Sequence, residues 1–452
     1  MLVAAAGVLG AAAVGGLAVL SPPLALVAVC AVAFVIAAVR DLTVGVALFT
    51  VITFFESIPG APTTGLTAVK GVGAVLAVSW LVLATDRRGN APFLLRDRPW
   101  LAYAAVFLGG WATVSMLWAT DPGRSLSDAF RLGQNVLLFF IVFSCIRERR
   151  DVRLLLWAYL AGAFSTALVG LAGATKPETL GPYGTDRLAG GIGDPNELAA
   201  LVAPALVLAA FSLATVRSPL GRLALLTCGG TIAVALLFTQ SRGGIVALVA
   251  ILATGAVLAG PLRARLLAVG LTTIALGISY FTFTGVPDQF QRLTAFSAGG
   301  GTGRLDLWRV TVEMIRDHPL LGVGHGNFQV VEPLYAIRNI NITYIEFVVD
   351  TPKVAHNTYL ELLTELGPIG LGAFVALVGG VLLTALRAAR SFGRLGARSL
   401  EIESRALLIG FLGMLAAFTF ITAQYEKQLW LLLGLMAGLG TLARRAGSGG
   451  VP

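Results

Sequence analysis

The sequence predicts an all-α polytopic membrane protein with about 12–14 transmembrane helices and one large extracytoplasmic loop containing short amphipathic helices. Three observations support this fold class. Of the 452 residues, 56% are hydrophobic and only 13% are charged, whereas a soluble domain has about 25% charged residues. Apolar stretches of bilayer length follow one another along most of the chain, and basic residues cluster in alternate connections. Together they exclude an ordinary soluble enzyme and a disordered chain.

Fourteen stretches are apolar and long enough to be predicted as spans, each of about 20 residues. They lie near 2–20, 23–39, 42–58, 66–85, 100–119, 127–146, 154–173, 196–216, 223–239, 244–260, 266–284, 357–386, 406–423 and 429–443. Pro22–Pro23 and Arg40–Asp41 separate the first three closely. Twelve or thirteen spans therefore fit the pattern as well.

The positions of Lys and Arg predict the orientation of the chain. With both termini in the cytoplasm, 20 of the 33 basic residues fall in predicted cytoplasmic connections, as the positive-inside rule requires. We expect eleven spans within 1–284, a large outer loop over 285–356, three spans within 357–443 and a cytoplasmic tail over 444–452. The N-terminal run lacks the basic start of a cleavable signal. The net charge of +9 then reflects topology and not a nucleic-acid partner.

The outer loop 285–356 has the polarity of a soluble segment, with six basic and seven acidic residues. Long loops in compact proteins usually carry function. Apolar residues recur there at helical spacing and predict an amphipathic helix at the outer interface: Leu305, Trp308, Val312 and Ile315. A smaller polar loop, 174–195, is expected on the same side of the membrane.

Three arginines on this side are candidates for binding an anion, because the planar guanidinium matches phosphate geometry. Arg242 lies at the turn between two apolar helices, Arg304 opens the amphipathic helix, and Arg187 lies in the smaller loop. Each has an alternative structural role. Arg242 would be a snorkelling interfacial residue, and Arg304 would cap its helix or pair with Asp306 or Glu332.

His356 stands where the large loop enters the twelfth predicted span. A neutral imidazole there can accept a proton from a hydroxyl group, although a histidine bonded to the backbone is an equal alternative. Glu361 and Glu365, one helical turn apart, could pair with arginines, orient His356 or satisfy other neighbours. We expect His318 to be a helix end and His325 a turn residue.

No metal or cofactor is expected. The three cysteines are widely spaced within apolar runs, and the histidines lack the spacing of a metal site. Neither a Walker A motif nor a Gly-rich dinucleotide motif occurs. Asp194, which precedes Pro195, is expected to cap a helix and to be structural.

Four segments, in order, resemble the O-antigen ligase / polysaccharide polymerase family of bacterial envelope proteins: RLAGGIGDPNELA, FTQSRGG, GRLDLWRVTVEMIRDHPLLGVGHGNF and AHNTYLELLTELGPIGL. The resemblance implies a glycosyltransferase of the membrane-embedded GT-C type. Such an enzyme moves a glycan from undecaprenyl diphosphate to an acceptor hydroxyl at the outer face of the bacterial cytoplasmic membrane, without a metal and with inversion.

The same resemblance implies roles for particular residues. Arg242 and Arg304 would hold the lipid diphosphate, and His356 would activate the acceptor hydroxyl. Arg187, Lys70 and Glu365 are expected to contribute to substrate binding.

The sequence does not identify the acceptor of the glycan. A glycolipid, a glycan or a protein would make the enzyme a ligase, whereas a second lipid-linked repeat unit would make it a polymerase with the same site. A membrane transporter of a small anion is the alternative of another class. Broken helices that meet at mid-membrane, or two similar halves of the chain, would favour a transporter. The sequence shows no such repeat.

Overall fold

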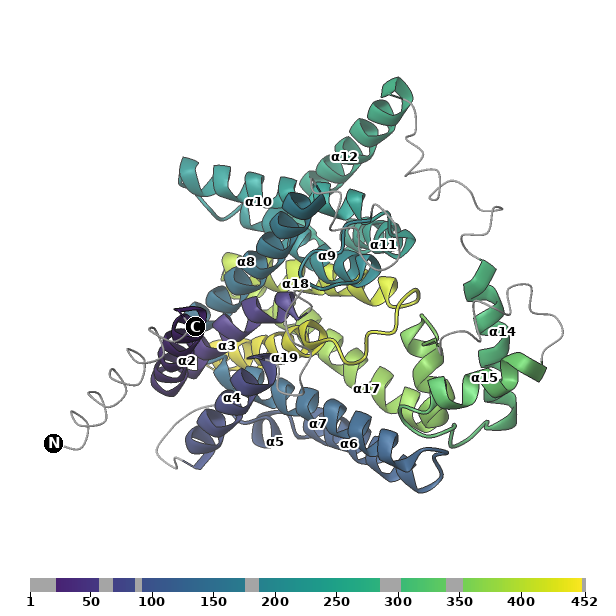
Figure 1. The fold of residues 1–452 in the computed structure, drawn as a ribbon. Coiled ribbons are helices and arrows are strands. Elements are labelled where there is room, and N and C mark those ends of the chain that lie inside the picture. Colours follow the sequence, from purple (N-terminus) through teal and green to yellow (C-terminus); the bar gives the residue numbers. More distant parts are fainter. Residues whose placement is uncertain are drawn as a thin grey trace.

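The computed structural model describes residues 22–56, 68–85, 92–174, 187–284, 302–338 and 353–448. Within these ranges the regular structure is helical and contains no strand (Figure 1). The structure therefore confirms an all-α polytopic membrane protein. The first predicted span, 2–20, lies outside the described residues.

The helices of the bundle coincide with the other thirteen predicted spans. They are α2 (Pro22–Arg40), α3 (Leu42–Ile52), α4 (Ala68–Thr85), α6 (Pro99–Val114), α7 (Pro122–Cys145), α8 (Arg149–Ala174), α9 (Pro195–Ser212), α10 (Pro219–Phe238), α11 (Arg242–Leu258), α12 (Arg263–Thr284), α17 (Thr358–Arg394), α18 (Arg398–Ala417) and α19 (Lys427–Gly447). Four short elements extend or connect them: η1 (Thr53–Phe55), α5 (Leu94–Asp97), η2 (Ser115–Leu117) and η4 (Gly260–Leu262). Two helices, α14 (Thr302–Asp317) and α15 (Phe328–Arg338), belong to the large loop.

Fewer of these helices meet the requirements of a span than the sequence predicted. In the described residues, seven helices are long and apolar enough to cross a membrane, or eight if the bent pair Arg242–Leu258 and Gly260–Ala268 is one span. The described parts of α2, α3 and α4 are apolar but shorter. Charged residues in the first two turns of α18 lower its hydropathy.

Side-chain caps explain where several helices begin. Asp121 caps α7, Asp194 caps α9, Ser241 caps α11 and Asn357 caps α17, each by accepting a hydrogen bond from a backbone amide in the first turn. These amides have no partner within the helix, so a short polar side chain before it stabilises the start. The predicted capping role of Asp194 is confirmed.

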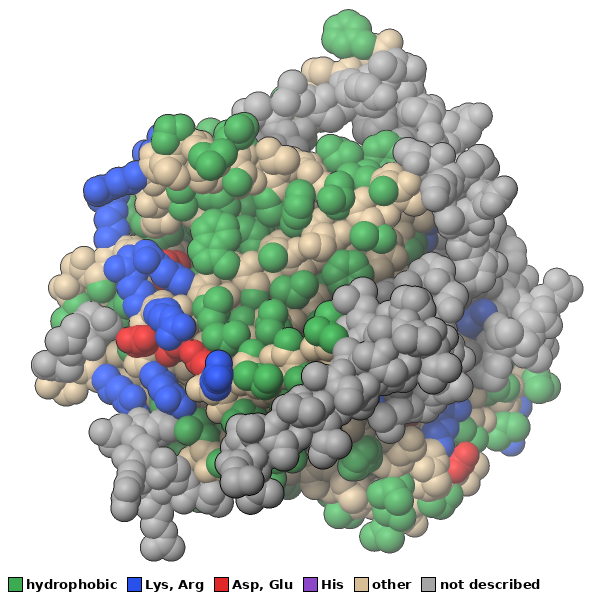
Figure 2. Space-filling model, turned by 60° about the vertical axis from the view of Figure 1, so that its left-hand side comes forward, with side chains coloured by type: hydrophobic (Ala, Val, Ile, Leu, Met, Phe, Trp, Pro, Cys, Tyr) green, Lys and Arg blue, Asp and Glu red, His purple; other side chains and the backbone are tan. Residues whose placement is uncertain are grey.

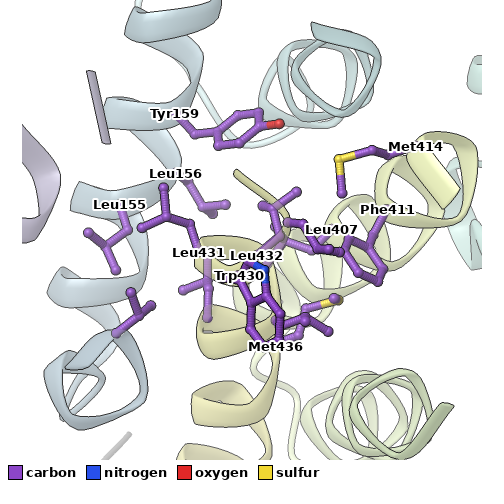
Figure 3. Packing of buried hydrophobic residues seen from close by; sticks show 14 of the residues in the cluster. Leu155, Leu156, Tyr159, Leu407, Phe411, Met414, Trp430, Leu431, Leu432 and Met436 are labelled. Carbon is purple, nitrogen blue, oxygen red and sulfur yellow. The ribbon is translucent and has the colours of Figure 1, made fainter. Parts of the chain in front are cut away.

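One part of the core of the bundle lies between α8, α18 and α19 (Figure 3). Leu155 and Tyr159 of α8 face Phe411 of α18 and Trp430 of α19 in this view. Trp430 is fully buried, and its indole N–H donates to the carbonyl of Gln424 at 2.9 Å. Buried aromatic side chains dominate core energetics, and their polar atoms need such partners.

The longest helix, α17, is broken near its start. Gly367 has φ of +65° and ψ of −174°, and Pro368 follows it, so the helical hydrogen bonds are interrupted there. The carbonyls left free at the break find other donors: the amide of Val323 donates to Thr364 and the indole of Trp111 to Leu366. The single predicted span 357–386 is therefore two helical pieces.

The large loop has a small hydrophobic core of its own. Its described part buries Val310 and Met314 of α14 against Phe328 and Tyr335 of α15. The face of α14 that packs into this core carries Leu307, Val310, Thr311 and Met314, whereas Leu305 of the predicted apolar face is 54% exposed. Helical periodicity alone does not reveal which of two partly apolar faces finds a neighbour.

The outside of the bundle is strongly apolar. Figure 2 shows a broad flank of hydrophobic side chains, with Lys, Arg, Asp and Glu gathered mostly at the left-hand edge of the view. Large side chains such as Val106, Leu220 and Val257 are more than half exposed on spanning helices. An exposed apolar surface of this extent is expected to face lipid.

Candidate functional site

The candidate site lies at the end of the bundle where α9, α11 and α17 begin and α10 and α18 end. We call this the site end. The amide of Leu188 donates to the carbonyl of Phe238, and the amide of Thr358 donates to that of Phe418. These two bonds join the segment before α9 to the end of α10, and the start of α17 to the end of α18.

The turn between α10 and α11 positions Arg242. Its Ser241 Oγ accepts from the amide of Gly244 at 3.2 Å, which makes Arg242 the first residue of α11. Gln240 takes a left-handed conformation (φ +50°), which costs energy for a residue with a Cβ. The two glycines that follow Arg242 lie close to neighbouring side chains. A Cβ on Gly243 would lie 3.3 Å from Phe420.

Arg187 is part of the frame behind this turn. Its Nε donates to the carbonyl of Thr239 at 2.9 Å, and its terminal nitrogen donates to Asn196 Oδ1 at 2.8 Å. The same amide oxygen accepts from Ser241 Oγ at 3.0 Å. Arg187 therefore lies beside the turn that carries Arg242 and connects it to the start of α9.

His356 occupies a strained position before α17. Its φ of +47° is the second left-handed conformation of a non-glycine residue in the described chain, besides that of Gln240. Such strain persists only where the surroundings impose it, and it clusters at functional sites. Here the surroundings are hydrogen bonds on both sides: Ala355 is held by its amide and its carbonyl, and Asn357 caps α17.

Glu361 supplies one of those bonds. Its buried carboxylate accepts from the amide of Ala355 at 2.9 Å, from the Thr422 hydroxyl and from Gln424 Nε2 at 3.3 Å. Among the roles considered for Glu361, the structure supports positioning, because the carboxylate fixes the backbone next to His356. It does not touch the imidazole in any hydrogen bond of the described residues.

Arg304 is brought to the same place by α14. One turn further along that helix, the Trp308 indole donates to the carbonyl of Ala355 at 3.0 Å and its ring lies 6.4 Å from that of Phe420. The predicted partners of Arg304 are engaged elsewhere. Asp306 forms an ion pair with Arg309 at 2.8 Å, and Glu332 lies beside Lys353.

The electrostatics show that these groups form one cluster, which we call the basic cluster: Arg242, Arg304, Lys353, His356 and Asp194. Burial, together with the charges of Arg304 and Lys353, lowers the pKa of His356 to about 4, against the opposing effect of Asp194. Burial also lowers the pKa of Arg304, with Asp194 raising it and Arg242 lowering it. All five side chains are half-buried, so a ligand can reach them in a partly dehydrated setting.

The chemistry of the basic cluster follows from its charges. The basic cluster combines three cations with the Asp194 carboxylate, and Glu332 lies beside Lys353. Guanidinium groups in this setting suit an anionic ligand such as a phosphate. The imidazole is neutral at pH 7 because its pKa is well below that value. A neutral imidazole can accept a proton.

Glu365 does not lie in the basic cluster. Its carboxylate oxygens lie 3.1 Å from His325 Nδ1 and 3.2 Å from the amide of Phe328, and both side chains of the His325–Glu365 pair are almost fully buried. The imidazole Nε2 lies 2.9 Å from the hydroxyl of Tyr425, whose ring stacks under Arg131 at 4.5 Å. The expectation that Glu365 binds substrate with the arginines is not supported by this geometry.

His325 is the residue that sequence reasoning missed. It was expected to be a turn residue, and it does lie in a turn, but it is fully buried and bonded through both ring nitrogens. The signal was present in its neighbours. Gly322, Gly324 and Gly326 all have positive φ, and a Cβ on Gly326 would lie 2.4 Å from the Asp128 carboxylate. Such a turn lets the backbone pack closely enough to bury the imidazole.

Lys70 is the other predicted residue that the structure does not bring to the cluster. It is exposed on α4, which packs mainly against α2, α3 and α7. Figure 1 draws α4 and α14 on opposite sides of the molecule. In the part of the chain that the structure describes, no group of three or more His, Cys, Asp or Glu side chains could hold a metal ion.

Comparison with known proteins shows which families and structures this chain is similar to. A family model described as O-antigen ligase matches residues 224–375, which include Arg242, Arg304 and His356 but neither Lys70 nor Arg187. No curated protein matches the chain. A solved chain from a peptidoglycan synthase complex that coordinates polymerization and crosslinking is 18% identical, with a TM-score of 0.41, over 77% of this chain and 97% of that chain. Residues 224–375 of this chain are therefore similar to the O-antigen ligase family.

Proposed function

We propose that the protein is a glycosyltransferase that moves a glycan from an undecaprenyl-diphosphate donor to an acceptor hydroxyl at the outer face of the bacterial cytoplasmic membrane. The observation that carries the proposal is the basic cluster, in which Arg242 of α11 acts on Arg304 of α14 and Arg304 acts on His356. These residues are more than 50 positions apart in the sequence, and all three fall within the family match.

The proposed reaction is a single displacement with inversion. The acceptor oxygen attacks the anomeric carbon and forms the new glycosidic bond, while the bond from that carbon to the diphosphate oxygen breaks. The acceptor proton passes to His356. The lipid diphosphate leaves with the electron pair, and Arg242 and Arg304 stabilise the negative charge that develops on it.

Donor binding also prepares the base. The low pKa of His356 in the free protein results from burial and from the positive charges of Arg304 and Lys353, and a bound diphosphate would offset those charges. A dianion placed among the arginines would raise the pKa of His356 towards its ordinary value. The imidazole would become a better base when the donor is in place.

The acceptor distinguishes a ligase from a polymerase, and both use the same groups. The decisive experiment incubates purified protein with an undecaprenyl-diphosphate-linked oligosaccharide and candidate acceptors, followed by mass analysis of the product. A glycan joined to a lipid core or protein indicates a ligase, whereas a longer lipid-linked chain indicates a polymerase. Absence of any product with every acceptor, in protein that is folded and membrane-inserted, would contradict the proposal.

A further inference from the structure

A groove of about 710 Å³ lies between the last turns of α17 and the first turns of α18. Its lining consists of Arg387, Arg390, Gly393, Arg394, Glu401 and Arg405. We call it the basic groove. Nothing in the proposed glycan transfer uses it.

The basic groove lies at the opposite end of the bundle from the basic cluster. Both α17 and α18 connect the two places, since the start of α17 bonds to Phe418 at the end of α18. The piece of α17 after its break, residues 368–394, is ~40 Å long at about 1.5 Å per residue. That length exceeds the ~30 Å hydrocarbon core of a bilayer.

The charges of the groove are not balanced. Glu401 is the single carboxylate in its lining, and it is bound to Arg405 at 2.9 Å. Arg405 is further fixed by donating to the carbonyl of Leu258 at 2.6 Å. The other three arginines are exposed and follow one face of α17: Arg387, Arg390 and Arg394. None of the ion pairs among the described residues includes one of these three.

Positive charge continues beyond the groove. The pKa of Arg98 falls to about 10, chiefly because of burial and further because of the charges of Arg444 and Arg387. Like charges held this closely repel one another, and a bound anion relieves that repulsion.

The level of the groove relative to lipid follows from the surface of α17. Leu383, one turn before Arg387, is 53% exposed. The change from exposed leucine to exposed arginine marks the level where hydrocarbon gives way to headgroups.

We propose that the basic groove binds the phosphate of an anionic phospholipid headgroup. Three guanidiniums that form no ion pair among the described residues line one wall of the groove, and the fixed Arg405 of α18 lies on the other wall. Guanidinium groups bind phosphate oxygens in pairs of parallel hydrogen bonds, and basic pockets between helices at this level are suited to anionic headgroups. A soluble phosphate compound would offer the same phosphate chemistry, and the experiment distinguishes it from a lipid headgroup.

The test uses full-length protein, delipidated in a neutral detergent and titrated with dioleoyl phosphatidylglycerol while bound lipid is counted by native mass spectrometry. The variant is R387Q/R390Q/R394Q. The matched control is R217Q/R263Q/R265Q, which removes the same charge at the same end of the bundle but outside the groove. Thermal unfolding of all three proteins in detergent establishes that they remain folded.

We expect wild type and the control to bind one phosphatidylglycerol more tightly than dioleoyl phosphatidylcholine, and the groove variant to bind it roughly 10- to 100-fold more weakly, as the loss of three interfacial charges implies. Equal phosphatidylglycerol binding by the groove variant and wild type overturns the proposal. So does equal weakening in both variants, because net charge alone then explains it. If millimolar inorganic phosphate displaces the lipid, the lipid assignment is wrong and the groove binds a soluble phosphate compound.

Discussion

The carboxylate of Glu361 accepts a hydrogen bond from the amide of Ala355 at 2.9 Å, and in this way α17 holds the residue that precedes His356. The carbonyl of Ala355 is held from the other side by Trp308 of α14. The imidazole is therefore positioned by two helices that are separated by a long stretch of sequence.

Replacing Glu361 should impair catalysis through position alone. Glu361→Ala removes the acceptor for the Ala355 amide, and we expect glycan transfer to fall about 10²-fold, the size of effect that a misplacement of about 1 Å produces. Glu361→Gln keeps one acceptor oxygen and should retain more activity. Initial rates with the lipid-linked donor measure both. Equal losses in the two variants would contradict a positioning role.

Replacing Arg242 or Arg304 by Ala should lower kcat by about 10²–10³-fold, because each loss removes stabilisation of the leaving diphosphate. Arg304→Lys should remain poor, since the ammonium lacks the planar fork. Arg316→Ala is the matched control, because Arg316 is exposed on the same helix, three turns away. Full activity in Arg304→Lys would reduce Arg304 to a general positive charge.

His356 can be tested without disturbing the backbone. Asn tolerates the left-handed conformation that His356 adopts (φ +47°), so His356→Asn should fold and insert normally but lose transfer by at least about 10²-fold. His318→Ala, in the exposed turn after α14, is the control and should keep wild-type rates. Comparable activity of His356→Asn and wild type would remove His356 from the mechanism.

The pH dependence should reveal coupling between His356 and the donor. Neutral His356 is the active form, so kcat/KM, which reports the free enzyme, should fall as the pH drops through about 4. Bound diphosphate raises the pKa, so kcat should begin to fall at a higher pH. Lys353→Gln removes a charge that lowers the pKa and should move the kcat/KM limb upwards. An unmoved limb would mean that another group titrates.

The buried pair of His325 and Glu365 should matter for stability. His325→Ala leaves the Glu365 carboxylate and the Tyr425 hydroxyl without their partner in the fold's interior, and we expect a loss of about 3 kcal/mol. Tyr425→Phe keeps the ring beneath Arg131 and should cost about 1 kcal/mol. Denaturation in detergent measures both. A small effect in His325→Ala would show that water replaces the imidazole.

Transfer should persist in EDTA. In the proposed mechanism the arginines stabilise the diphosphate charge that a divalent cation would otherwise balance. Product formation after exhaustive chelation, compared with added Mg²⁺, measures this. A strict requirement for Mg²⁺ would overturn the metal-independent mechanism.

The sequence by itself determined the helices and their caps, because both depend on residues close together in the chain. The hydrophobic run before Arg40, the cap at Asp194 and the soluble polarity of the large loop are local properties. They were sufficient for the fold class. The resemblance to a known family also singled out Arg242, Arg304 and His356.

Tertiary structure alone decided which side chains meet. Packing decided which face of α14 is buried in the core of the large loop, broke α17 at Gly367, buried His325 against Glu365 and left Lys70 on a distant helix. The reason is physical. Periodicity and capping act over one or two helical turns, whereas the neighbours of a side chain depend on how helices from distant parts of the sequence pack together.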